Sequence, residues 1–149
     1  MKRFVLVLLI ALLAHPALAE SPIEVTADTF VVDQANSEAT FTGNVVITRS
    51  DLKVWADKVL VTFGKEGLQN IQHITATGRV RLKTDEQDAT GDRATFDPNS
   101  QIMRLTGNVT VVNASGTLNG PELVVDLVNQ TTTFSASGGG RVTGVFTPQ

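Results

Sequence analysis

Few side chains in this sequence could carry out chemistry, and the most regular of them are three aspartates. Asp28, Asp57 and Asp92 could suggest carboxylate chemistry. Each of them, however, stands at the same place in a different copy of a repeated segment, which occupies residues 27–33, 56–61, 91–97 and 120–126. Side chains that recur once per copy are expected to be spaced along the molecule rather than gathered in one site. We therefore interpret them as structural residues at turns or bends.

The other candidates for metal binding or nucleophilic chemistry are weaker. Asp85, Glu86 and Asp88 could bind calcium, but they lack the glycine and the terminal glutamate of a known calcium loop, so we expect a solvated loop. His73 is the only histidine after residue 19, and a metal site normally needs several ligands. No serine stands in a G-x-S-x-G context, and there is no cysteine. The sequence predicts no enzyme, no metal site and no cofactor.

The first 19 residues are typical of an export signal. Lys2 and Arg3 precede the apolar run 4–14, and Ala17-Leu18-Ala19 forms a small-residue cleavage site. The apolar run is too short for a membrane span, which needs about 20 residues. An uncleaved anchor is the alternative. We expect cleavage after Ala19 and a mature domain over residues 20–149, a single domain located in the periplasm.

The charge and composition of this mature chain exclude some functions. Without Lys2 and Arg3, ten basic residues stand against 15 acidic ones, a net charge of about −5. Nucleic-acid binding needs basic side chains to neutralise phosphates, so nucleic acid is not an expected partner. An exported chain without disulfides must be held together by packing and strand pairing.

The expected secondary structure follows from a second repeated segment. It occupies residues 39–45, 74–80 and 103–109, and more faintly 134–138. Its glycines, Gly43, Gly78 and Gly107, recur about every 30 residues, which is typical of stacked repeats. Between them, β-branched and aromatic residues alternate with polar ones, and Asp, Asn, Gly and Pro mark regular breaks. The pattern predicts an all-β fold with one interior shared by all the copies.

The repeated glycine stands in the middle of a predicted strand rather than at its end. A glycine there weakens a strand unless it marks a bend or a close approach. We therefore expect each strand to turn a corner at this position and to pass from one sheet to another. The predicted architecture is an all-β double sheet, wound as a jelly roll or a solenoid-like sandwich.

Several of these segments resemble a known family. Residues 39–48, 52–59, 105–109 and 141–145 are similar to the LptA/OstA-like family of lipopolysaccharide-transport proteins, and the similarity extends over the mature chain. The resemblance implies a β-jelly roll of many short antiparallel strands with a V-shaped section and open ends. It also implies that the protein belongs to a Gram-negative bacterium and lies in the periplasm. There it would bind the acyl chains of lipopolysaccharide during outer-membrane assembly.

The family pattern also implies where the cargo and the partners bind. Apolar residues on the inward faces of the strands are the candidates for the lipid groove, although an ordinary packed core is the alternative. These candidates are Phe30, Val32, Phe41, Val45, Val59, Val61, Ile74, Phe96, Leu105, Val109, Leu123 and Val125. Unprotected edge strands at the two ends are the candidate partner surfaces. They contain Ile23, Val25, Val142, Val145 and Phe146.

The expected partners are lipopolysaccharide, an inner-membrane-anchored LptC-like protein, an outer-membrane LptD-like protein and further copies of the chain, joined head to tail. Two other functions remain open at this point. A non-enzymatic structural or adhesive β-repeat protein would be expected to have more copies of the repeat. A carbohydrate-binding jelly roll would be expected to expose Trp or Tyr platforms, whereas this chain has one Trp and no Tyr.

Overall fold

The computed structural model describes residues 22–50, 52–136 and 139–148, and within them it contains ten β-strands and no helix. The strands are β1 (Glu24–Thr26), β2 (Thr29–Asp33), β3 (Glu38–Arg49), β4 (Leu52–Gly64), β5 (Gly67–Lys83), β6 (Gln87–Asp97), β7 (Ile102–Asn113), β8 (Gly116–Asp126), β9 (Thr131–Ser135) and β10 (Thr143–Phe146). The predicted signal segment, with its cleavage after Ala19, and Gly138 of the fourth repeat lie outside the described residues. Among the described residues there is no helix that could span a membrane.

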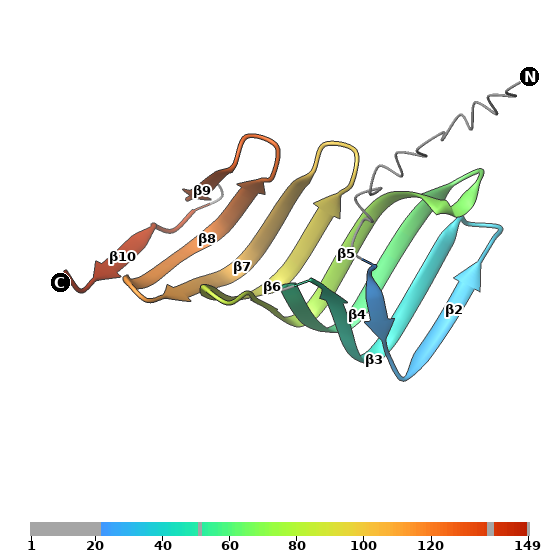
Figure 1. Cartoon of the computed structure of the whole chain (residues 1–149), viewed down its shortest axis with the longest axis horizontal. Coiled ribbons are helices and arrows are strands. Elements are labelled where there is room, and N and C mark those ends of the chain that lie inside the picture. Colours follow the sequence, from blue (N-terminus) through green and yellow to red (C-terminus); the bar gives the residue numbers. More distant parts are fainter. Residues whose placement is uncertain (1–21, 51, 137–138, 149) are drawn as a thin grey trace, which may run out of the picture.

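All ten strands belong to one antiparallel sheet with a simple order (Figure 1). The main path runs β1-β3-β4-β5-β6-β7-β8-β10, while β2 also pairs with β3 and β9 also pairs with β8. At each end of the molecule, two short strands thus share the edge of one long strand. The prediction of an antiparallel all-β fold is confirmed.

The long strands β3 to β8 bend in the middle, where the pairing register shifts between each of them and its neighbours. The bends divide the sheet into two half-sheets. Half-sheet A contains β1, β10 and the strand segments 45–49, 52–56, 80–83, 87–91, 109–113 and 116–120. Half-sheet B contains β2, β9 and the segments 38–42, 58–64, 67–77, 93–97, 102–106 and 122–126. The long strands have 11 to 17 residues and are longer than the expected short strands, because each continues through its bend.

The repeated glycines form these bends, as the sequence predicts. Gly43, Gly78 and Gly107 have φ values of +85°, +80° and +79°, a conformation that L residues rarely adopt. The residue after each of them, Asn44, Arg79 or Asn108, also has a positive φ. Two successive left-handed residues opposite one residue of the neighbouring strand make a β-bulge, which bends the strand and increases its twist.

The regular breaks of the sequence become the turns at the outer margins of the half-sheets. Turns at 33–37, 64–67, 97–101 and 126–130 border half-sheet B, and those after β3, β5 and β7 border half-sheet A. The buried apolar residues of both half-sheets form a single core cluster. No polar or charged residue in the described part of the chain is buried. The molecule is therefore a folded sheet with its apolar side chains on the inside.

Candidate functional site

The inner face of half-sheet B carries two rows of apolar side chains that cross every strand. The row beside the bend, the bend row of half-sheet B, consists of Phe30, Phe41, Val59, Ala76, Ala94, Leu105, Leu123 and Phe134. The row nearer the turns, the lip row of half-sheet B, consists of Val32, Ala39, Val61, Ile74, Phe96, Met103, Val125 and Thr132. In each row, register partners stand side by side on one face of the sheet.

Half-sheet A carries the matching pair of rows. Its bend row consists of Val45, Ala56, Val80, Gly91, Val109 and Gly120. Its lip row consists of Val25, Ile47, Val54, Leu82, Ala89, Val111, Leu118 and Gly144. Of the 30 positions in the four rows, only Thr132 carries a polar side chain. The arrangement forms a continuous apolar strip with no group suited to catalysis.

All twelve groove residues predicted from the sequence lie in these rows, but they differ in burial. Six are buried: Val45, Val59, Val61, Leu105, Val109 and Leu123. Four are half-buried: Phe41, Ile74, Phe96 and Val125. Phe30 and Val32 are 49% and 40% exposed because they lie on the edge strand β2. Five of the six buried residues lie near the fold of the sheet, in the two bend rows.

The sequence-based list underestimated half-sheet A. In its lip row, Leu82 and Val111 belong to the buried core, and Ile47 and Val54 pack against that core. None of these four residues was among the predicted groove residues. The alternation of residues along segments 45–49, 52–56, 80–83 and 109–113 is the signal that places them on the inner face.

The two ends of the sheet expose apolar side chains, including four of the five predicted partner residues. At the first end Ile23 is 52% exposed, and Phe30 stacks on Phe41 with ring centroids 4.4 Å apart. At the other end Val142, Val145 and Phe146 are 40%, 63% and 60% exposed. Val25 is half-buried and packs against the core from β1.

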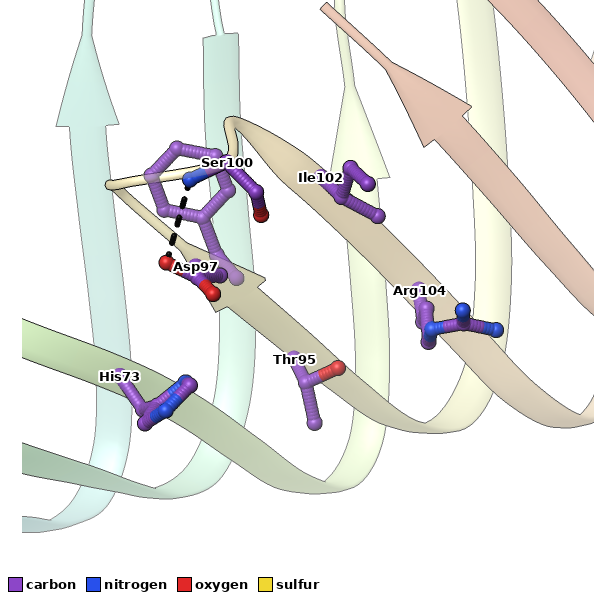
Figure 2. A pocket seen from close by; sticks show the side chains of 7 residues that line it. His73, Thr95, Asp97, Ser100, Ile102 and Arg104 are labelled. Carbon is purple, nitrogen blue, oxygen red and sulfur yellow. Dashed lines mark hydrogen bonds between the residues drawn. The ribbon is translucent and has the colours of Figure 1, made fainter.

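A separate hollow of about 270 Å³ lies on the outer surface over β5, β6 and β7 (Figure 2). Its polar residues have structural roles. Asp97 accepts hydrogen bonds from the backbone N–H groups of Asn99 (2.8 Å) and Ser100 (3.3 Å), and these bonds, first of all the one from Asn99, lower its pKa. His73 is exposed, as predicted. Asp97 thus stabilises the turn at 97–101, and Phe96 is the one residue of the apolar rows that also lines this hollow.

The other acidic residues singled out from the sequence also have structural roles. Asp28, Asp57 and Asp92 lie against the three bend glycines, and their carboxylates pair with Asn44, Arg79 and Asn108 respectively. Asp85 and Glu86 are exposed, while Asp88 pairs with Arg81. The described residues contain no group of three or more His, Cys, Asp or Glu that could hold a metal ion.

Comparisons with known proteins give one consistent answer. Residues 24–131 match the family model described as LptA/(LptD N-terminal domain) LPS transport protein. The lipopolysaccharide export system protein LptA of Haemophilus influenzae is 27% identical over 133 residues, covering 85% of this chain and 77% of that protein. The LptA of Escherichia coli K12 is 28% identical over 134 residues, covering 87% and 72%.

A solved structure shares the fold. LptH of Pseudomonas aeruginosa, described as the LptA-homologous periplasmic component of the lipopolysaccharide transport device, superimposes with a TM-score of 0.73. The match covers 87% of this chain and 97% of that one at 22% sequence identity. The likeness establishes the arrangement of strands described above.

Proposed function

Because the chain belongs to the family of LptA and LptD N-terminal domain lipopolysaccharide transport proteins, we propose that it carries lipopolysaccharide and shields the acyl chains between its half-sheets. The observation that carries this proposal is the set of four apolar rows, three of which cross all eight strands of their half-sheet and one of which crosses β3 to β8. Each methylene removed from water contributes roughly 0.8 kcal/mol, so an apolar strip is a suitable shelter for acyl chains. The sugars of the cargo then remain outside.

The difference in burial between the rows suggests which residues meet the cargo. Most bend-row residues are buried near the fold, whereas Ile74, Phe96 and Val125 of the lip row in half-sheet B are half-buried. We assign the buried residues of all four rows to sealing the closed side, and these half-buried lip-row residues to contact with acyl chains. A row of similar positions offers many weak sites in succession, which suits movement along the sheet better than one tight site.

The second part of the proposal is that the protein bridges the two membranes by head-to-tail assembly. The path through each half-sheet contains eight strands, from β1 to β10 or from β2 to β9, and neighbours are antiparallel throughout. With an even number, the last strand runs opposite to the first. A second copy stacked end to end therefore continues the antiparallel alternation in both half-sheets at once. Such strand addition satisfies the unpaired backbone groups of both edges.

The same two ends are the proposed contacts with the other transport components. An inner-membrane-anchored LptC-like protein and an outer-membrane LptD-like protein would dock by the same strand addition. Location in the periplasm and cleavage of the signal segment after Ala19 belong to this proposal, and the apolar segment with its small-residue site supports them.

Photo-crosslinking in cells tests the acyl-chain site. Val125 and Val124 offer a matched pair, because Val125 lies in the lip row opposite Met103 while Val124 lies opposite Arg104 on the outer face. Ile74 and Thr75 provide a second pair on β5, opposite Phe96 and Thr95. A photoreactive residue at Val125 or Ile74 is expected to give lipopolysaccharide adducts, and one at Val124 or Thr75 is not.

The contrast in lipopolysaccharide adducts between the inner and the outer member of each pair decides whether the acyl-chain groove exists. Equal adducts at both members of a pair, or none at the inner members in variants that retain the wild-type thermal unfolding temperature, would contradict the acyl-chain groove. The inner rows would then be an ordinary core, and the chain would act as a structural adaptor between the membranes.

A further inference from the structure

The basic side chains of this acidic protein are concentrated in one region. Seven of the ten Lys and Arg residues after residue 19 lie between Arg49 and Lys83, a span with only three acidic residues. This span contains the neighbouring strands β4 and β5 (Figure 1). In half-sheet A, Lys53 stands opposite Lys83 and Trp55 opposite Arg81, while Val54 between them points into the core. The cations therefore lie on the outer face.

The only tryptophan of the chain lies among these cations. The Lys53 Nζ atom is 5.7 Å from the centre of the Trp55 ring, and the Arg81 guanidinium carbon is 5.2 Å from it. Arg81 is held by two hydrogen bonds to Asp88, of 2.9 and 2.5 Å. Arg79 is held in the same way by Asp57, with bonds of 2.9 and 3.3 Å, and its side chain is 88% exposed.

Each guanidinium therefore has a fixed orientation and spare hydrogen-bonding capacity. An arginine carries five N–H donors, and each of these two arginines uses two of them on its carboxylate. Such planar forks match carboxylate and phosphate groups, which a lysine contacts only as a point charge. The two arginines border a hollow of about 360 Å³, also lined by Asn44, Trp55 and Asp57.

A second hollow of about 410 Å³ provides an internal comparison. It lies at the β7–β8 bend, with Asn108 in the place of Asn44. Asn119 replaces Trp55, and Pro121 replaces Asp57. The bend thus accounts for the existence of both hollows. The second hollow is also lined by one arginine, Arg141. The bend does not account for the aromatic ring and the pair of carboxylate-bound arginines, which line only the first hollow.

We propose that the outer hollow at the β4–β5 bend binds an anionic saccharide. The arginine forks bind a phosphate or carboxylate substituent, and Asn44 and Asp57 bind hydroxyl groups. The Trp55 ring, which Lys53 and Arg81 flank, contacts the C–H groups of the sugar beside them. A few convergent polar groups beside an aromatic surface are typical of small-molecule sites. The cations and Trp55 of this site lie on the outer face, although Val45 and Ala56 of the bend row of half-sheet A also line the hollow. The saccharide site goes beyond the proposed acyl-chain function and does not depend on it.

Intrinsic tryptophan fluorescence reports on binding in this hollow, because Trp55 is the only tryptophan of the chain. The probes are an acyl-free diglucosamine bisphosphate, a disaccharide containing muramic acid, neutral chitobiose and inorganic phosphate. A saturable change in Trp55 emission is expected with an anionic disaccharide, at concentrations where chitobiose and phosphate give none. The phosphorylated probe points to the sugars of the lipid cargo as the source, and the muramic acid probe points to the cell-wall glycan.

Charge-neutral variants show whether the arginines make the site. Arg79→Gln and Arg81→Gln are each expected to weaken binding about tenfold or more, since each removes hydrogen bonds between a charged donor and a charged acceptor. Arg104→Gln removes an outer-face cation that pairs with Glu122 away from the hollow, and should leave the affinity unchanged. The proposal is overturned if neither anionic disaccharide changes the emission, if chitobiose or phosphate binds equally well, or if the two arginine variants bind like the wild type.

Discussion

At the residue scale, the three bends use the same small set of contacts. A Cβ atom added to Gly43, Gly78 or Gly107 would lie 2.4–2.5 Å from a carboxylate oxygen of the adjacent aspartate. The glycine is thus required for two separate reasons, its left-handed backbone and its contact with the aspartate. The aspartate in turn accepts a hydrogen bond from the residue after the glycine. This mutual fit accounts for the joint recurrence of glycine and aspartate along the sequence.

A comparison of Gly78→Ala with Gly67→Ala separates the cost of the left-handed backbone from the cost of displacing the aspartate. Gly67 also has a left-handed φ, +77°, but an added Cβ atom there would have no neighbour within 4 Å. Gly67→Ala should therefore lower the free energy of unfolding by about 1 kcal/mol, the backbone cost alone. Gly78→Ala adds the displacement of Asp57 and should cost roughly 2 kcal/mol or more. Urea unfolding measures both, and equal losses would mean that the aspartate contact contributes nothing.

At the scale of elements, the strands and their turns were predictable and the half-sheets only partly so. The alternation around Ile74 and Leu105 is a local signal, and so is the Asp-Pro-Asn-Ser turn at 97–100. The bends could be inferred because a glycine in the middle of a strand weakens it unless the chain bends or is closely approached there. The depth of a residue could not be inferred, since Leu105 and Phe96 belong to similar alternating segments although one is buried and the other half-buried. Depth depends on which side chains face each other across the folded sheet.

The turns bordering half-sheet B should make stability depend on pH. Hydrogen bonds from Asn36 lower the pKa of Asp33, chiefly through the amide side chain, and the backbone N–H of Asn129 is the main cause that lowers the pKa of Asp126. The pKa of Asp97 is lowered in the same manner. The unfolded chain therefore binds more protons than the folded one near and below the ordinary aspartate pKa of about 3.9, so stability should fall as pH falls through this range.

The measurement is the urea midpoint between pH 6 and pH 3 for the wild type and for the triple variant Asp33→Asn, Asp97→Asn, Asp126→Asn. Asparagine can still accept the turn hydrogen bonds but does not titrate here, so the variant should retain a midpoint near neutral pH and lose part of the acid slope. An unchanged slope would show that the turn carboxylates do not determine the acid stability.

At the scale of the whole molecule, the two ends of the folded sheet are different surfaces, because β1 and β2 form one end while β9 and β10 form the other. A contact between them is heterologous, so it can repeat without limit unless the rotation closes a ring. Phe30 on β2 and Phe146 on β10 mark the two ends, and both are largely exposed. The inner rows of one copy would then meet those of the next, and the apolar strip would continue across the junction. Under the proposed function, assembly and transport would therefore be coupled through the same residues.

Variants that block one end at a time test whether copies of the chain join through two different ends. Every heterologous contact uses one end of each kind, so Phe30→Asp and Phe146→Asp should each reduce assembly strongly when alone in solution. Mixed together, the two variants retain one intact end each and should form a one-to-one heterodimer but nothing longer. Light scattering after size-exclusion chromatography distinguishes monomer, dimer and longer species. Homodimers of either variant alone would instead indicate a two-fold contact between equal ends, in which case the copies could not form a continuous groove between the membranes.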